Sequence, residues 1–155
     1  MAAIRIVQAG QGDRPTVLDL VGRLLRELDD DPAEFRGIER PKMLRDLERA
    51  GNRFTVFLAR DAEGEAVGVT TVMEAFAIYA GGDYGIIDEM YVAPEHRSRG
   101  VGALLIGAVK DLGRRRDWMR IDVAAPPEAR WARTVKFYEG QGFTFTGPKL
   151  RIMLR

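Results

Sequence analysis

The sequence contains no cysteine and a single histidine, His96. The absence of thiols excludes disulfides, thiolate catalysis and cysteine-ligated metal sites, and one histidine excludes a multi-histidine metal site. Long apolar stretches are also missing. The longest stretch without a formal charge runs from Gly100 to Val109, about half of the roughly 20 residues that a membrane-spanning helix needs. We therefore expect no metal cofactor and no membrane segment.

An excess of one charge is missing as well. The chain has 24 Lys and Arg against 23 Asp and Glu, whereas nucleic-acid binders usually carry a strong basic excess. A basic cluster at Arg114, Arg115, Arg116 and Arg120 is explained mostly by the favourable placement of positive charge at a helix C-terminus, so a nucleic-acid or protein-binding surface there is the weaker interpretation. We expect no nucleic-acid partner. Because no secretory segment follows Met1, we expect a cytoplasmic protein.

The 155 residues, 46% of them hydrophobic, suit one globular domain spanning residues 1–155. Residue spacing predicts about seven strands and four helices. The strands are expected around Ile4 and Ile6 and over residues 53–60, 66–76, 84–92, 118–124, 143–146 and 150–154. The helices are expected after Gly12 and Asp13, after a capping box at residues 31–34, from Val101, and from residues 126–128. Short turns favour antiparallel pairing, but the helix after Val92 implies one parallel pair, so the predicted fold class is α/β with a mixed, mostly antiparallel sheet.

The most informative segment leads from Tyr91 to Gly102, out of a strand and into a helix through a loop rich in Arg and Gly. Glycines can leave backbone N–H groups open to a ligand, and these groups, the helix N-terminus and nearby arginines would bind a phosphate or pyrophosphate. The alternative is that the glycines serve turn geometry and helix packing alone. No Gly-Lys-Ser/Thr sequence is present, and Leu105 replaces the third glycine of a dinucleotide-binding motif, which excludes both of those nucleotide sites.

The loop resembles the Arg/Gln-x-x-Gly-x-Gly/Ala motif of the GNAT superfamily of N-acetyltransferases, whose members bind acetyl-CoA. The matching residues are Arg97-Ser98-Arg99-Gly100-Val101-Gly102. The preceding Val92-x-Pro94-Glu95-x-Arg97 and the downstream Phe137-Tyr138-Glu139-Gly140-Gln141-Gly142-Phe143 are similar to the pattern of the same superfamily. The resemblance extends over nearly the whole chain, since the predicted order of elements agrees as well.

The resemblance implies where acetyl-CoA would bind. The pyrophosphate would lie against residues Arg97, Ser98, Arg99, Gly100, Val101, Gly102 and Ala103. The strand ending at Val92 would splay from its parallel neighbour, so that the pantetheine arm bonds to the backbone of Met90, Tyr91 and Val92. An N–H group near Met90 would stabilise the charge that develops on the acetyl oxygen.

Two adjacent carboxylates, Asp88 and Glu89, lie in the same predicted strand. A lysine-like amine is almost fully protonated at pH 7, and its deprotonation costs about 4.6 kcal/mol, so some group must accept the proton. A buried carboxylate is costly without a partner, so at least one of the two should open on the cleft. Either residue is a candidate general base. The alternative is that both are structural, one at a bulge and the other in an ion pair.

Tyr138 is the expected general acid and also a cofactor contact, because a hydroxyl in a dry cleft can protonate the departing CoA thiolate. The alternative is a packed aromatic ring with its hydroxyl at the surface. His96 is expected to be solvated, with no role. Trp131 and Thr134 stand where many similar proteins have Asn and Ala, so a cofactor contact from that asparagine is not expected, and Trp131 suits the core or the cleft wall.

The implied activity is transfer of an acetyl group from acetyl-CoA to a primary amine of a small molecule or peptide, by direct attack in a ternary complex. A non-catalytic acyl-CoA-binding or sensor module is the alternative, and similar proteins often form homodimers. Asp29 and Asp30 follow a helix C-terminus, where negative charge is disfavoured. Together with Asp83, Asp88 and Glu89 they would attract a cationic amine, unless residues 29–34 are a solvated acidic loop.

Overall fold

The computed structural model of the chain describes residues 3–28, 38–124, 132–147 and 149–154. Its contacts divide the chain into two compact units, Met1–Asp122 and Val123–Arg155. The larger unit contains most of the sheet and three helices, and the smaller one contains the last helix. Each unit is described by itself below.

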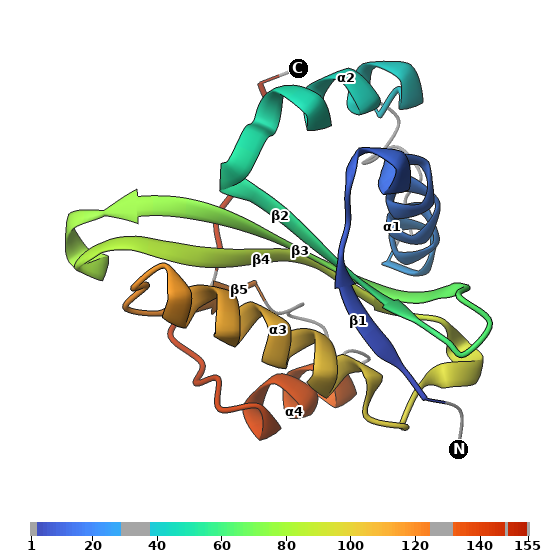
Figure 1. The fold of residues 1–155 in the computed structure, drawn as a ribbon. Helices are drawn as coiled ribbons and strands as arrows, with labels where there is room; N and C mark the ends of the chain where they lie inside the picture. Colours follow the sequence, from blue (N-terminus) through green and yellow to red (C-terminus); the bar gives the residue numbers. More distant parts are fainter. Residues whose placement is uncertain (1–2, 29–37, 125–131, 148, 155) are drawn as a thin grey trace. The chain divides into compact units, whose positions relative to one another are not determined.

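The sheet has five strands in the order β1-β2-β3-β4-β5 (Figure 1). They are β1 (Arg5–Gln8), β2 (Phe54–Arg60), β3 (Ala66–Ala77), β4 (Gly82–Val92) and β5 (Ile121–Val123). The pairs β1 with β2, β2 with β3 and β3 with β4 are antiparallel, and the sheet as a whole is mixed. The predicted meander of the three central strands and the mixed sheet are therefore confirmed.

The prediction of about seven strands is wrong. The described residues of 143–147 and 149–154 contain no strand, and the predicted strand 118–124 is reduced to Ile121–Val123. Alternating residues show only that a segment would suit a sheet, whereas a strand also needs a neighbour for its backbone hydrogen bonds. In the last segment Leu150, Ile152 and Leu154 are 82–91% exposed, so these alternating hydrophobic side chains are not buried.

Four α-helices lie within the described residues, in agreement with the number predicted. They are α1 (Arg14–Leu28), α2 (Arg40–Ala50), α3 (Val101–Arg115) and α4 (Ala132–Gly140). A 3-10 turn over Gln11–Asp13 precedes α1, and the Asp13 carboxylate accepts the Gly10 N–H at 2.8 Å. The predicted capping box at residues 31–34 and the predicted helix start at residues 126–128 lie outside the described residues.

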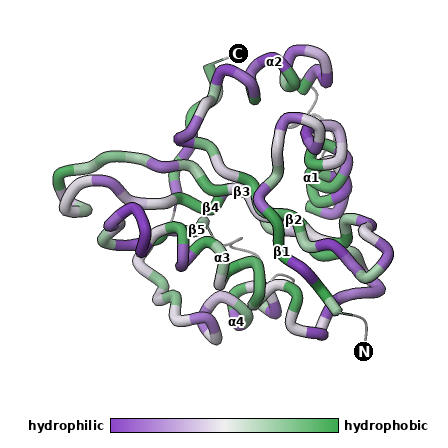
Figure 2. Tube along the Cα trace, in the orientation of Figure 1, coloured by the Kyte–Doolittle hydropathy of each residue, from purple (hydrophilic) through white to green (hydrophobic). Residues whose placement is uncertain are grey.

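Helices α1 and α3 cover opposite faces of the sheet, as two adjacent residues of β3 show. Successive side chains of a strand point to opposite faces. Val69 packs in a buried cluster with Val17 and Leu20 of α1, whereas a Cβ at Gly68 would lie 3.3 Å from Leu105 of α3 (Figure 1). Hydrophobic residues follow the central strands and α3, which places the core of the larger unit between the sheet and these helices (Figure 2).

The hairpin end of β4 is tightly packed. A Cβ at Gly85 would lie 2.4 Å from the Trp118 ring, and one at Gly113 of α3 would lie 3.0 Å from it, so the two glycines make room for the indole. The indole N–H donates to the Glu74 carboxylate at 2.5 Å. The Arg120 guanidinium lies 4.8 Å from the ring centre of Tyr79 and 5.3 Å from that of Tyr84. These contacts tie β3, β4, α3 and the start of β5 together.

Candidate active site

The polar part of the candidate site lies on β4, where its pairing with β3 is interrupted. Glu89 pairs with Thr71 while Ile87 pairs with Val72, so Asp88 is an extra residue that forms a β-bulge. Thr71 lies two residues after Val69 and therefore shares the face of the sheet that α1 covers. Directly paired residues share a face, which puts Glu89 on the α1 face and Ile87 on the other. The bulge thus reverses the alternation along β4.

Two threonine hydroxyls of β3 bind the polar groups of Glu89. The Thr71 hydroxyl accepts the Glu89 N–H at 3.1 Å and donates to the Glu89 carboxylate. The Thr70 hydroxyl donates to the Glu89 carbonyl at 3.0 Å. Burial raises the pKa of the Glu89 carboxyl, the Thr71 hydrogen bond lowers it, and the adjacent Asp88 raises it, with a net increase. Of the two predicted bases, Glu89 is half-buried with a raised pKa, whereas Asp88 is exposed.

On the side of β5, the described strand residues do not extend to the last residues of β4. The Gly85 N–H donates to the Arg120 carbonyl at 3.2 Å, which aligns the start of β5 with Gly85. Because β5 is described over only three residues, Ile121–Val123, it is too short to reach Met90, Tyr91 and Val92 as well. The backbone groups of these three predicted cofactor residues are therefore not used by the described residues of β5.

Residues 97–103, named the cradle, form the end of the loop after β4 and the start of α3. Residues 97–100 are exposed, Ser98 and Gly100 have positive φ angles of 61° and 82°, and nothing lies within 4 Å of a Cβ placed at Gly100. The first hydrogen bond of α3 runs from the Leu104 N–H to the Gly100 carbonyl at 3.1 Å. The N–H groups of Val101, Gly102 and Ala103 thus have no acceptor within the helix, which is the usual geometry for anion binding.

The Arg97 side chain does not face this cradle. Its Nε donates to the Val92 carbonyl at 2.8 Å, and its terminal nitrogen donates to the Glu27 carboxylate of α1 at 2.8 Å. The guanidinium also lies 5.5 Å from the centre of the Tyr91 ring. Arg97 therefore links the loop to β4 and α1.

His96 departs from the expectation of a solvated side chain. It is 21% exposed, and its Nδ1 is buried without a hydrogen-bond partner. His96 is the last residue of the 3-10 turn Pro94–His96, which directly follows β4 and Ala93.

Tyr138 belongs to the smaller unit and lies in α4. Its ring packs against Phe137 and Phe143, with ring centres 5.3 and 5.6 Å away. Burial raises the pKa of Tyr138 to about 12, so the hydroxyl stays protonated at neutral pH. Thr134 is half-buried in the same helix. Trp131 lies outside the described residues.

The acidic residues predicted to attract a cationic amine are described only in part. Asp29, Asp30, Asp31 and Glu34 lie outside the described residues. Asp83 is exposed near the hairpin end of β4, and Asp88 and Glu89 lie near the opposite end of the strand. Within the described chain the acidic residues of β4 therefore do not form one compact group.

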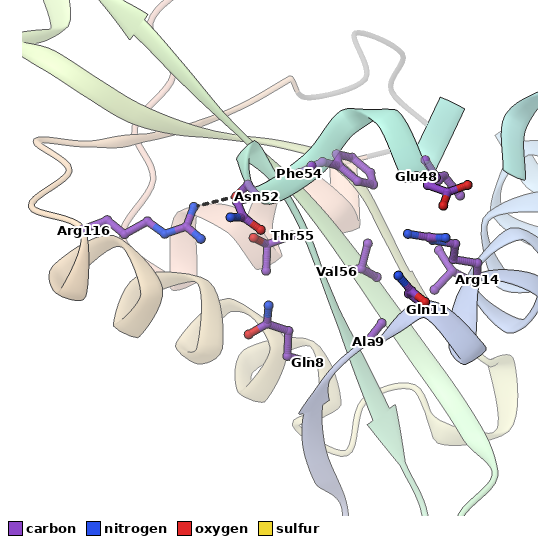
Figure 3. Close-up of a pocket in the computed structure, with 14 residues that line it drawn as sticks. Gln8, Ala9, Gln11, Arg14, Glu48, Asn52, Phe54, Thr55, Val56 and Arg116 are labelled. Carbon is purple, nitrogen blue, oxygen red and sulfur yellow. Dashed lines mark hydrogen bonds between the residues drawn. The ribbon is translucent and has the colours of Figure 1, made fainter. Parts of the chain in front are cut away.

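A cavity of about 380 Å³ lies elsewhere in the larger unit, along β2 beyond the end of β1 (Figure 3). Its lining includes Arg14, Glu48, Phe54 and Val56, and at one end Arg116 donates to the Asn52 carbonyl at 3.1 Å. None of the predicted site residues lines this cavity.

Sequence reasoning missed Thr70, Thr71 and Glu27. The signal for the threonines was a Thr-Thr pair inside an otherwise apolar strand, at a site that pairs with the candidate carboxylates. Nothing local signals Glu27, because its partner Arg97 is 70 residues away in the sequence.

Residues 22–143 match the family model of the acetyltransferase (GNAT) family, which is more than half of the chain. The chain belongs to the GNAT family. The order of elements in this GNAT chain, with the strand, glycine loop and helix at residues 82–115, agrees with that assignment. It is accordingly an acyltransferase enzyme.

Solved structures similar to this GNAT chain cover almost all of it at low identity. The aminoglycoside N-acetyltransferase AAC(6')-Iy in complex with CoA matches with a TM-score of 0.80 at 19% identity, over 100% of this chain and 97% of that one. The aminoglycoside acetyltransferase HMB0005, from an uncultured soil metagenomic sample, has a TM-score of 0.81 at 21% identity, with 99% of each chain covered. The ribosomal-protein-alanine N-acetyltransferase from Brucella melitensis biovar Abortus 2308 has a TM-score of 0.72 at 20% identity, again with 99% of each chain covered. These likenesses establish a common fold.

No curated protein sequence matches the GNAT chain. Among the described residues, no helix has the length and hydropathy needed to cross a membrane. The same residues contain no group of three His, Asp or Glu side chains placed to hold a metal ion.

Proposed function

We propose that this enzyme transfers the acetyl group of acetyl-CoA to a primary amine, by direct attack in a ternary complex. The observation that carries the proposal is the position of Glu89. A half-buried carboxylate with a raised pKa lies at a β-bulge, three residues before the end of the strand that leads into the loop proposed to bind the cofactor phosphates. A proton acceptor and a cofactor cradle are thus connected by one short segment.

The residues of the cradle fit the phosphates of acetyl-CoA. Gly100 leaves open space in front of the α3 N-terminus, and the N–H groups of Val101, Gly102 and Ala103 have no acceptor within the helix. Arg99 adds a positive charge to the same exposed loop. The backbone of Met90, Tyr91 and Val92, which the described residues of β5 do not reach, is the proposed partner of the pantetheine arm. The Met90 N–H is the proposed donor to the acetyl oxygen.

Glu89 is the proposed general base. When bound, acetyl-CoA supplies a thioester whose C–S bond breaks as the amine nitrogen bonds to the carbonyl carbon. Glu89 accepts the proton that the ammonium must lose, directly or through a water molecule. A raised pKa favours this role because it brings the carboxylate closer in basicity to the amine, while Thr71 keeps the carboxylate stabilised in its ionised form. Asp88 is exposed and is the weaker candidate.

Tyr138 is the proposed proton donor to the departing sulfur. Its pKa of about 12 ensures that the hydroxyl is protonated when the reaction begins. A thiol titrates near 8.5, so complete transfer of that proton is uphill by about 5 kcal/mol. Tyr138 therefore contributes mainly a hydrogen bond to the sulfur as charge develops there, and the thiolate is protonated by Tyr138 or by solvent.

The proposed acceptor is a cationic amine. Glu89 and Asp88 supply negative charge on β4, and two structural neighbours are described as aminoglycoside acetyltransferases, whereas another is described as acting on a ribosomal protein. Aminoglycosides, polyamines and a peptide with an N-terminal alanine therefore form the first panel of acceptors.

The test has two parts. Thermal unfolding with and without acetyl-CoA measures binding, and release of free thiol with the amine panel measures transfer. Acetyl-CoA is expected to raise the Tm, and a cationic amine is expected to give the fastest thiol release, which falls with added salt. A raised Tm without thiol release for any amine would favour the non-catalytic acyl-CoA sensor. A faster reaction with neutral or acidic amines would contradict the cationic acceptor alone.

Tyr138→Phe tests the acid separately, because it keeps the ring and removes the hydroxyl. It is expected to lower kcat by roughly 100-fold or more while the Kd for acetyl-CoA stays within about twofold. Phe143→Leu is the control, since it alters packing against the same ring without removing a proton donor. A kcat of Tyr138→Phe close to that of the parent would contradict the role of Tyr138.

A further inference from the structure

At the β-bulge, backbone groups of β4 lack their regular hydrogen-bond partners in the backbone of β3. Side-chain hydroxyls of β3 bind these groups instead. In a regular antiparallel ladder, backbone carbonyls accept the N–H groups of the neighbouring strand. At Glu89 the acceptor is instead the Thr71 hydroxyl, 3.1 Å from the N–H. The Glu89 carbonyl is bound by the Thr70 hydroxyl at 3.0 Å. Both threonines are almost fully buried, with 0% and 2% exposure, so water does not compete strongly for these hydroxyls.

The Thr71 hydroxyl has a second bond that Thr70 lacks. A hydroxyl has one proton and two lone pairs, so Thr71 can accept the Glu89 N–H and at the same time donate its proton to the Glu89 carboxylate. The branched Cβ of threonine restricts the side-chain torsion, which limits the positions that the hydroxyl can adopt. One side chain therefore fixes both the backbone and the carboxylate of the same residue.

Thr71 also opposes the two effects that raise the pKa of Glu89. Burial and Asp88 both raise the pKa of Glu89, and the Thr71 hydrogen bond lowers it. Several acidic groups on elements that pack against β4 have partners of their own: Asp19 of α1 with Arg40, Glu27 of α1 with Arg97, Glu74 of β3 with Arg116, and Asp122 of β5 with Arg120. The other charged groups of α1 are the cations Arg14, Arg23 and Arg26. Helix α3 packs on the opposite face of the sheet.

We propose that Thr71 is a positioning residue for acetyl transfer, holding the Glu89 carboxylate in place and in its proton-accepting form. This role rests on the proposed function of Glu89 as the base. Thr71 itself does not exchange a proton with the substrate. Its contribution is to bond the ionised carboxylate, so that Glu89 can take up the proton of the amine at neutral pH.

The experiment compares Thr71→Val, Thr71→Ser and Thr70→Val with the parent enzyme. Thr71→Val keeps the shape of the side chain and removes the hydroxyl. Thr71→Ser keeps the hydroxyl. Thr70→Val is the matched control, because it removes a neighbouring buried hydroxyl that binds the Glu89 carbonyl rather than its carboxylate. The first readout is the carbon-13 NMR titration of the Glu89 carboxyl, assigned with Glu89→Gln, and the second is kcat/KM against pH.

In Thr71→Val, both the Glu89 titration and the acid limb of kcat/KM are expected to move to higher pH, because the ionised carboxylate loses a donor. At a pH on that limb, kcat/KM falls roughly tenfold for each pH unit of displacement. Thr71→Ser is expected to restore both curves. Thr70→Val is expected to lower the Tm and leave both curves in place. If Thr71→Val does not fold, Thr71→Cys, a weaker donor of similar size, is expected to move both curves in the same direction by less.

The two readouts separate failure of this role from failure of the proposed function. An unchanged NMR titration in Thr71→Val would overturn the role of Thr71, while thiol release by the parent would still support acetyl transfer. A shifted titration with an unmoved acid limb would overturn both Glu89 as the base and Thr71 as its positioning residue. A parent enzyme that releases no thiol with any amine would overturn the positioning role together with the proposed reaction.

Discussion

The two ends of β4 are built for different purposes. At the hairpin end, Gly85 admits the Trp118 ring, and the register with β3 is regular from Gly82 to Ile87. At the other end, Asp88 interrupts the register, and side-chain hydroxyls form hydrogen bonds with the polar groups of Glu89. The chain then passes into a loop where Ser98 and Gly100 have positive φ angles.

The difference shows how one strand can serve both stability and chemistry. A regular ladder with a packed aromatic ring uses its backbone groups and buries apolar surface, which leaves little for a ligand to bind. A bulge and a helix N-terminus leave polar groups available, and each costs some stability. Substitutions at the bulge end should therefore change activity more than stability, and those at the hairpin end should do the reverse.

The largest effect on activity is expected from Glu89→Gln. Removal of a general base typically costs about 10²- to 10⁴-fold in rate, so kcat should fall within that range. Asp88→Asn is the matched control, because it neutralises the adjacent, exposed carboxylate at the bulge. Thiol release with a saturating amine measures both variants. A larger loss in Asp88→Asn than in Glu89→Gln would assign the base to Asp88.

The same Glu89→Gln variant should be more stable than the parent at neutral pH. Because the folded-state pKa of Glu89 is raised above 4.5, the folded protein binds more protons than the unfolded chain between 4.5 and that raised value. The contribution of Glu89 to stability therefore decreases as the pH rises through this window and is lowest above it. Chemical denaturation at pH 4 and pH 8 should show a larger advantage of Glu89→Gln at pH 8. An advantage confined to pH 4 would contradict the raised pKa.

The next effect is expected from Gly100→Val, which places a branched side chain in the cradle. Loss of charge-assisted hydrogen bonds should weaken acetyl-CoA binding roughly 10- to 100-fold, measured by calorimetry. Gly64→Val is the control, since Gly64 has a φ angle of 87°, close to the 82° of Gly100, and also has nothing within 4 Å of an added Cβ. Both variants should lose similar stability, about 1–2 kcal/mol. Equal acetyl-CoA affinity in the two variants would contradict the proposed role of Gly100 in acetyl-CoA binding.

A substitution at the hairpin end should instead change the stability of the protein. In Gly85→Ala the new Cβ would lie 2.4 Å from the Trp118 ring, which must shift, so the free energy of unfolding should fall by about 1–3 kcal/mol. Gly107→Ala is the control on α3, where nothing lies within 4 Å and alanine should stabilise the helix by up to about 1 kcal/mol. In both variants kcat should stay within about twofold of the parent. A large loss of kcat in Gly85→Ala would show that the two ends are coupled.

The smallest effect is expected from Glu27→Gln, which breaks the ion pair that fixes Arg97. Both side chains are more than a third exposed, so the pair should contribute less than about 1 kcal/mol to the free energy of unfolding. The difference from the parent should shrink in high salt, as measured by denaturation at two ionic strengths. A loss well above that value would show that the Arg97 contact holds more of the loop than one exposed ion pair can.

The helices and the loop that leads into α3 were predictable from the sequence because their signals are local. The spacing of apolar residues in α1 and α3 and the glycine before Val101 act over a few residues, so the boundaries of these helices and the position of the loop follow from neighbouring residues. Asp88 and Glu89 were predictable as candidates for the same reason, since two carboxylates within one apolar strand require an explanation.

The choice between Asp88 and Glu89, and the hydroxyls that bind Glu89, depend on tertiary structure. The bulge exists only because β3 and β4 pair in one register, and Thr71 meets Glu89 across 18 residues of sequence. Arg97, a predicted phosphate contact, meets Glu27 across 70 residues. The last two predicted strands are the opposite case, a pattern in the sequence that the structure does not use. Hydrophobic and polar residues alternate in 143–147 and 149–154 as they do in strands, but these residues have no paired neighbouring strand. Periodicity is a property of a segment and can be decided by the sequence, whereas strand pairing, register and burial arise only when distant segments meet.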